Sequence, residues 1–148
     1  MTSLMTPVDL SSVGHPTYRQ SFPNEPSTAG LGRHLLREVL GIWRLESLTD
    51  VAALVVTELI ANAARHTPCR EIRLSIERPS ATWLRLGVLD RAPTRLPMLD
   101  RAGRDAESGR GLFLVDALAD RWGYDLRGPT DRAWGKEVWA ELRIADST

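Results

Sequence analysis

The sequence contains very little cysteine and very little lysine. Cys69 is the only cysteine among 148 residues, and Lys136 is the only lysine. One thiol cannot form an internal disulfide or a multi-cysteine metal site, and such scarcity is typical of proteins from a reducing cytoplasm. Arginine supplies all other basic side chains, which fits a GC-rich genome and by itself indicates no function.

The sequence also lacks net charge, a long apolar run and a targeting segment. Lysine plus arginine and aspartate plus glutamate number 19 each, so the formal net charge is zero. No basic stripe with interleaved aromatic residues points to nucleic acid. No apolar run looks long enough to span a bilayer, and the N-terminus lacks the basic start and apolar core of a signal peptide. We therefore expect a cytoplasmic protein that binds neither nucleic acid nor membrane.

The chain is long enough for one domain with a sizeable core. Residues 1–18 mix Ser, Thr, Pro and Gly without periodicity and are predicted to form a flexible tail, followed by a single domain over residues 19–148. Within it, hydrophobic periodicity and turn residues predict strands at 19–22, 69–78, 82–90, 121–126 and 136–144, and helices at 27–43, 47–66 and 112–119. Residues 91–108 are predicted to form a long loop.

The order of these elements predicts the fold class. A Pro-Ser pair at 79 and 80 favours a hairpin, so the strands on either side should be antiparallel. We expect an α+β protein, a two-layer sandwich in which about three α-helices cover one face of a mostly antiparallel or mixed β-sheet. The first helix should bury Leu31, Leu35, Val39 and Ile42, and the second should open with a capping box at 47–50.

Two polar residues stand out in the second helix. The run from 51 to 64 is apolar almost all round, which predicts a largely buried helix. Glu58 and Asn62 interrupt it four residues apart, so both should lie on one face. A buried carboxylate is unfavourable without a partner. Glu58 is a candidate general base, and Asn62 is a candidate ligand for Mg²⁺, which usually keeps phosphate oxygens and waters. Pairing of Glu58 with Arg65 is the alternative.

Two further segments are candidate ligand contacts. Asp90 shares the parity of Leu84, Leu86 and Val88, so its carboxylate should point into the domain. It could accept a hydrogen bond from a ligand amine, such as that of adenine, or cap its own turn. The segment 109–111, Gly-Arg-Gly, precedes a predicted helix, where free backbone amides attract anions. A lone Gly-x-Gly is weak evidence, because many loops contain one.

Taken together, these motifs resemble those of the GHKL ATPase superfamily, and within it the small anti-sigma factor kinases of bacteria. Residues 57–66 resemble the N box, 107–115 the second glycine box and 135–142 the closing strand motif. Residues 88–90 stand where the first glycine box belongs. The resemblance covers roughly residues 21–142 and implies a Bergerat-type sandwich that binds ATP and Mg²⁺.

The resemblance also implies roles for individual residues. It assigns Glu58 as general base, Asn62 as Mg²⁺ ligand and Asp90 as the residue that reads adenine. Gly109 and Gly111 become the phosphate hinge of a lid at about 91–108. The remaining expected nucleotide contacts are Arg65, Arg110 and Leu112.

Anti-sigma factor kinases bind a sigma factor and phosphorylate a Ser or Thr of a small antagonist protein, often as dimers. The resemblance therefore implies a serine/threonine kinase that controls transcription through such partners, as a possible homodimer. The exposed face of the first helix, with Arg33 and Arg37, is a candidate partner surface, although solvated arginines are an equal alternative. The other functional reading is a weak or inactive binding module that sequesters a protein partner.

The sequence departs from the family pattern at two places. After Asp90 the family continues with glycines, whereas this chain has Arg91, Ala92 and Pro93. Proline fixes φ and removes a donor, so this loop cannot act as a glycine loop. Lys136 and Glu137 stand where a Thr commonly follows the glycine of the closing motif. The resemblance is therefore stronger on the phosphate side of the site than on the adenine side.

Overall fold

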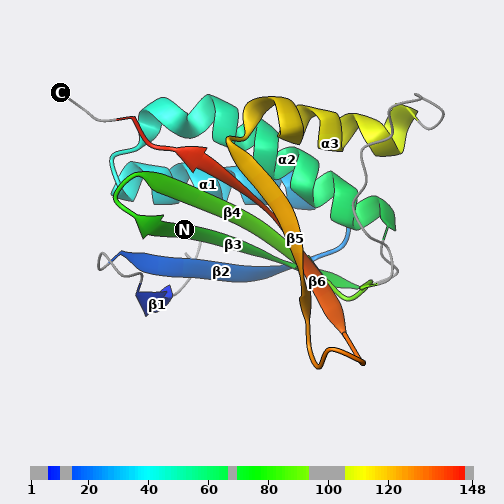
Figure 1. Cartoon of the computed structure of the whole chain (residues 1–148). Helices are drawn as coiled ribbons and strands as arrows, with labels where there is room; N and C mark the ends of the chain where they lie inside the picture. Colours follow the sequence, from blue (N-terminus) through cyan, green and yellow to red (C-terminus); the bar gives the residue numbers. More distant parts are fainter. Residues whose placement is uncertain (1–6, 11–14, 67–69, 94–105, 146–148) are drawn as a thin grey trace.

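The fold is a two-layer sandwich of three α-helices on one face of an antiparallel sheet (Figure 1). This is a computed structural model, and it describes residues 7–10, 15–66, 70–93 and 106–145; of residues 7–10, 65, 66 and 106–111 only the backbone is described. The sheet within these ranges has six strands in the order β1-β2-β3-β4-β6-β5, and every neighbouring pair is antiparallel. The predicted fold class is confirmed.

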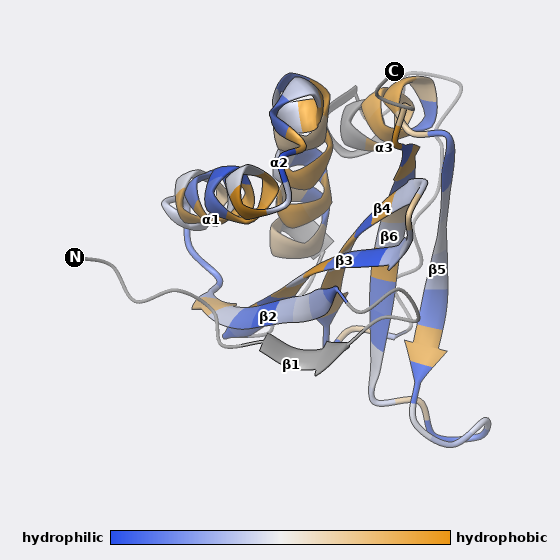
Figure 2. Ribbon diagram, turned by 90° about the vertical axis from the view of Figure 1, so that its left-hand side faces the viewer, coloured by the Kyte–Doolittle hydropathy of each residue, from blue (hydrophilic) through white to orange (hydrophobic). Residues whose placement is uncertain are grey.

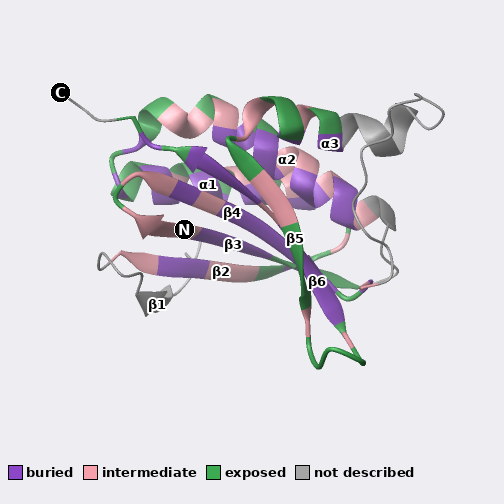
Figure 3. Cartoon of the chain, viewed as in Figure 1, coloured by how far each residue is buried: buried purple, intermediate pink, exposed green. Residues whose placement is uncertain are grey.

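The strands of the sheet are β1 (Pro7–Leu10), β2 (Pro16–Pro23), β3 (Glu71–Ser80), β4 (Trp83–Asp90), β5 (Arg121–Arg127) and β6 (Gly135–Arg143). The helices are α1 (Thr28–Ile42), α2 (Thr49–His66) and α3 (Ala106–Leu118), with a short 3₁₀ helix η1 (Glu46–Leu48) before α2. Central strands β3, β4 and β6 alternate side chains between the two faces, and their helix-facing residues are buried (Figure 3).

Helix α2 lies between α1 and α3 and contacts β3, β4 and β6 (Figure 2). Its side chains Val55, Val56 and Leu59 are fully buried against the sheet. One helical stretch, Glu46–Ala64, is long and apolar enough to cross a membrane by length and composition, contrary to our expectation that no run would be. Its apolar side is the core of this sandwich, so burial inside the domain explains its composition.

Two expectations about helix burial were wrong. Leu54 on α2 is 51% exposed, and Leu31 and Ile42 on α1 are 47% and 55% exposed. In α1 the core side is centred on Gly32, Leu36 and Val39, so residues at the flank of that stripe reach solvent. The predicted capping box is also absent, because η1 occupies residues 46–48 and α2 begins at Thr49.

Several boundaries differ from the prediction. Residues 7–10, placed in the predicted tail, pair with β2 as β1, and β2 begins at Pro16 rather than at residue 19. The strand predicted to end at 78 continues through Ser80, with an irregular register between Glu77 and Ser80, so the turn lies at 81–82. Of the long loop, residues 94–105 lie outside the described part of the chain.

Candidate nucleotide site

The candidate site begins on the side of α2 that faces away from α1. Asn62 is buried at 6% exposure, whereas Glu58 is only half-buried. The expectation that both would be buried was therefore wrong for Glu58. In an α-helix each four-residue step advances about 40° around the axis. The series Leu54, Glu58, Asn62 thus turns from solvent, through the edge of the helix, into the domain.

The side chains of Glu58 and Asn62 are not used by the fold. Within the described residues, neither makes a hydrogen bond or an ion pair with another residue. Among the described residues, the buried side-chain atoms without a hydrogen-bond partner are Trp43 Nε1, Arg78 Nε and Trp139 Nε1, so the amide of Asn62 is not sealed from solvent although the residue is only 6% exposed. Asn62 therefore has a free amide that a ligand can reach. Arg65, the alternative partner of Glu58, has no described side chain.

Asn62 is suited to Mg²⁺ only if a ligand supplies the remaining oxygens. Among the described residues no group of three His, Cys, Asp or Glu side chains could hold a metal ion. An all-protein metal cage is thus absent from that part of the chain. Mg²⁺ typically uses one or two protein oxygens and completes its octahedral shell with phosphate oxygens and water. The single amide oxygen of Asn62, one turn from Glu58, fits that requirement.

Asp90 lies at the end of β4 and points to the helix-covered face, as its parity predicts. It is 1% exposed and stands directly opposite Lys136 of β6 in the sheet register. The Lys136 ammonium donates to Asp90 Oδ1 at 3.0 Å and to Oδ2 at 2.9 Å. The backbone N–H of Ala92 also donates to Oδ1, at 2.8 Å. Asp90 therefore faces inward, as its parity predicts, and of the two predicted possibilities the structure shows the cap of its own turn.

The last residue of β4, Asp90, approaches β6 closely at Gly135, the glycine of the closing motif. A β-carbon at Gly135 would lie 2.6 Å from the backbone oxygen of Asp90. Only glycine permits that approach without a backbone shift, which explains the residue at this place. It also brings Lys136 directly against the carboxylate of Asp90.

Lys136 and Glu137 point to opposite faces of the sheet. Lys136 is 1% exposed on the helix-covered face, while Glu137 lies over Gly87 on the outer face. Arg127 binds Glu137 there at 2.5 Å. Of the two residues that differ from the closing motif of the family, only Lys136 therefore contacts Asp90. Sequence reasoning identified Asp90 but missed its partner, although Lys136 shares parity with the buried residues Val138 and Ala140 and is the sole lysine.

The outer face of the sheet carries a charged network that, within the described part of the chain, has no link to Glu58 or Asn62. Arg85 lies 3.3 Å from both Asp125 and Glu141, and Arg121 binds Glu141 at 2.9 Å. Glu77 belongs to the same face: burial raises its pKa, and the positive charge of Arg85 opposes that rise. These ion pairs join β4, β5 and β6, and the charged side chains of this face neutralise one another.

The second glycine box lies inside a helix. We predicted that 109–111 would precede the helix, yet α3 begins at Ala106, so Gly109, Arg110 and Gly111 are helical residues. Their amides are therefore not the first free N–H groups of α3, so the expectation that they lie at the helix start was wrong, while their contact with phosphate stays a prediction. Leu112 is buried at 2% exposure. Its nucleotide contact, like those of Arg65 and Arg110, stays a prediction.

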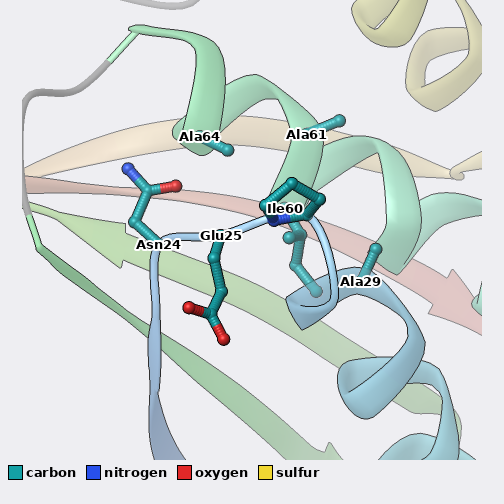
Figure 4. A pocket seen from close by; sticks show the side chains of 7 residues that line it. Asn24, Glu25, Ala29, Ile60, Ala61 and Ala64 are labelled. Carbon is teal, nitrogen blue, oxygen red and sulfur yellow. The ribbon is translucent and has the colours of Figure 1, made fainter.

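A pocket of about 450 Å³ opens on the other side of α2 (Figure 4). It is lined by Asn24 and Glu25 of the β2–α1 link and by Ala29 of α1, together with Ile60, Ala61 and Ala64 of α2. It does not include Glu58 or Asn62, which lie on the opposite flank of the helix. The pocket is therefore separate from the candidate nucleotide site.

The fold and the N-box residues define the class of the protein. Residues 22–141 match the family model described as histidine kinase-like ATPase domain. The chain belongs to this family, and membership of an ATPase-domain family implies ATP binding. The predicted family is confirmed.

Individual relatives add to this. Over 74 residues, which are 49% of this chain and 68% of the relative, the sequence is 42% identical to the uncharacterized protein SCO4941 of Streptomyces coelicolor. The RsbU and RsbW domains of Rv1364c from Mycobacterium tuberculosis share the fold with a TM-score of 0.62 at 17% identity, over 90% of this chain. This chain spans only 34% of that structure.

A second solved structure is matched over most of its own length. The SiaB-SiaC complex from Pseudomonas aeruginosa is similar with a TM-score of 0.56 at 15% identity, over 85% of this chain and 89% of the matched chain. At such identities the likeness establishes the fold alone. The relatives therefore support the fold of this family and assign no substrate.

Proposed function

We propose that this protein is a cytoplasmic regulator of the anti-sigma factor kinase type. It transfers the γ-phosphoryl group of ATP to a Ser or Thr hydroxyl of a partner antagonist protein and controls transcription through a sigma factor. The observation that carries the proposal is Asn62, a residue that is 6% exposed and whose amide makes no hydrogen bond to another described residue, one turn from Glu58 in an ATPase-domain fold. One of the similar structures is a complex of two proteins, which supports a protein partner.

In the proposed reaction Glu58 acts as general base. Its carboxylate accepts the proton of the partner's hydroxyl group, and the hydroxyl oxygen forms a bond to the γ-phosphorus. The bond from that phosphorus to the β–γ bridging oxygen breaks, and ADP leaves. The half-buried position of Glu58 supports this role, because a side chain of a second protein must be able to reach the carboxylate.

Asn62 is the proposed ligand of Mg²⁺ through its amide oxygen. Mg²⁺ held there would supply positive charge to the phosphate oxygens of the nucleotide. Burial of Asn62 at one helix turn from the base holds the metal ligand and Glu58 in a fixed relation. Gly109 and Gly111 remain the proposed hinge for phosphate contact.

A second candidate function is a binding module that keeps the fold and has little or no turnover. The pairing of Asp90 with Lys136 favours it, because the carboxylate expected to read adenine is occupied inside the protein. In this alternative the protein sequesters its partner by surface contacts.

The predicted partner face on α1 is narrower than expected: Arg37 is exposed, but Arg33 is half-buried and donates to Thr57 at 3.1 Å.

Calorimetric titration with ATP and Mg²⁺ separates these two functions. The wild type should bind ATP in a Mg²⁺-dependent manner, and Asn62→Ala should abolish the Mg²⁺ dependence while the protein stays folded by circular dichroism. Glu58→Gln should bind ATP as the wild type does. Glu46→Gln, which removes a matched carboxylate from the exposed η1, is the control. If the wild type produces no heat and no thermal shift at millimolar ATP, the kinase proposal fails and the binding module stands.

The homodimer expected from the resemblance is part of the proposal. Leu31 and Ile42 are exposed on one side of α1, with the His34–Glu38 ion pair of 2.6 Å between them. Size-exclusion chromatography with light scattering tests the assembly. A dimeric wild type that becomes monomeric with Leu31→Glu supports it, and a monomer at all concentrations contradicts it.

A further inference from the structure

Every hydrogen-bond donor of the Lys136 ammonium is already used inside the protein. A lysine ammonium has three N–H groups. They reach Asp90 Oδ1 at 3.0 Å, Asp90 Oδ2 at 2.9 Å and the backbone oxygen of Ala92 at 2.9 Å. The side chains of Lys136 and Asp90 are 1% and 0% exposed. The pair is therefore saturated and sealed from solvent.

This arrangement changes what Asp90 can do for a ligand. A carboxylate recognises the amine of a base only if an oxygen is free and reachable. Here both oxygens accept from Lys136, and Oδ1 accepts in addition from the N–H of Ala92. A ligand amine would have to displace the ammonium and leave it buried without its partner, which is strongly unfavourable. Asp90 is thus unavailable as a reader of the base.

Among the described residues, two side chains that flank this pair on the same face of the sheet do not favour one base over another. Across the β5–β6 register Leu126 stands opposite Lys136, and Tyr124 stands opposite Val138, so both lie on the same face of the sheet as the pair. They are 49% and 40% exposed. Apolar and aromatic side chains accept any base by stacking, because every base has a π-face. Leu126 has no polar side-chain atom, and the Tyr124 hydroxyl can either donate or accept a hydrogen bond, so neither side chain requires one particular base.

We propose that Lys136 is a specificity-determining residue: by occupying Asp90 it leaves the nucleotide to be held through its phosphates, so that nucleoside triphosphates bind without selection of the base. The inference rests on the proposed function and refines it. Recognition of the nucleotide then depends on the Asn62 side of the site, where the sequence resembles the family motif most clearly. The class of ligand is a nucleoside triphosphate with Mg²⁺, rather than ATP alone.

Parallel calorimetric titrations with ATP and GTP, each with Mg²⁺, test this inference. The wild type should bind the two with dissociation constants within about threefold of each other, well below the tenfold that one hydrogen bond to a charged acceptor provides. Lys136→Thr frees Asp90 and should favour ATP over GTP by about tenfold or more. Arg132→Thr removes an exposed positive charge from the β5–β6 link and should keep the wild-type ratio.

A second variant keeps the test decisive if Lys136→Thr does not fold. The double substitution Asp90→Leu with Lys136→Met removes both charges and should bind ATP with wild-type affinity. A wild type that prefers ATP by more than about tenfold overturns the inference and leaves the proposed nucleotide site intact. Equal affinities in a folded Lys136→Thr, or loss of ATP affinity in the folded double variant, also overturn it. Absence of binding by both nucleotides in the wild type overturns the proposed function itself.

Discussion

The buried pair of Asp90 and Lys136 gives a prediction about stability that needs no ligand. Lys136→Met keeps the length of the side chain and removes the charge, which leaves the Asp90 carboxylate at the end of β4 without its counter-ion. Because both side chains are at most 1% exposed, water cannot replace the lost partner. Breaking a buried pair by removing one member destabilises a protein by about 3–5 kcal/mol.

The expected loss is large enough for ordinary unfolding experiments. For a domain of this size about 1 kcal/mol corresponds to roughly 2–4 °C in Tm, so Lys136→Met should lower Tm by roughly 6–20 °C. Asp90→Leu should cost about as much. The double variant should recover most of the loss, because two well-packed apolar side chains often replace a buried pair with little change in stability.

Urea denaturation of the wild type, both single variants and the double variant measures the coupling between the two residues. Arg132→Met, which removes an exposed positive charge, is the control and should change the free energy of unfolding by less than about 0.5 kcal/mol. If Lys136→Met costs less than about 1 kcal/mol, the pair is not sealed in solution and the reasoning about base recognition fails with it.

Two further predictions concern residues of the sheet, the first with a helix glycine for comparison. Gly135→Ala places a β-carbon 2.6 Å from the backbone oxygen of Asp90 and should destabilise the protein by about 1–3 kcal/mol. Gly41→Ala in α1 meets no atom within 4 Å and should stabilise the protein by about 0.5–1 kcal/mol; thermal unfolding measures both changes. Burial raises the pKa of Glu77, so the folded state favours the protonated side chain. The resulting contribution of Glu77 to the free energy of unfolding is fully present below the ordinary pKa of 4.5 and is lost as the pH rises through the raised pKa. Glu77→Gln should therefore raise Tm at pH 7 and leave it unchanged near pH 4; an equal effect at both pH values would contradict this.

Local patterns in the sequence predicted most of the sheet and the helices. Alternation in 69–78 and 82–90 placed the β3–β4 hairpin correctly to within a few residues, because one face of each strand is buried and the period of two is clear. The same parity placed Asp90 on the helix-covered face. Periodicity did not reveal β1, whose four residues pair only with β2 at the edge of the sheet.

Features that depend on long-range register could not be predicted. Asp90 and Lys136 meet because β4 and β6 pair with these two residues opposite each other, and no local pattern fixes that register. The exposure of Leu54 depends on which side of α2 the neighbouring helices cover. The start of α3 at Ala106 was missed because two glycines favoured a loop there. The roles of Glu58, Asn62 and the glycines were predicted by resemblance and stay predictions.

The central claim is that a metal–triphosphate complex binds beside Asn62. The most direct measurement is an NMR titration of isotopically labelled protein with ATP and paramagnetic Mn²⁺ in place of Mg²⁺, since the metal broadens the nearest nuclei first. We expect the side-chain amide of Asn62 and the backbone amides around Glu58 to broaden first, at low Mn²⁺, and only when ATP is present. Broadening first at Asn24 and Ala29 in the separate pocket, or no ATP-dependent broadening at all, would contradict the account.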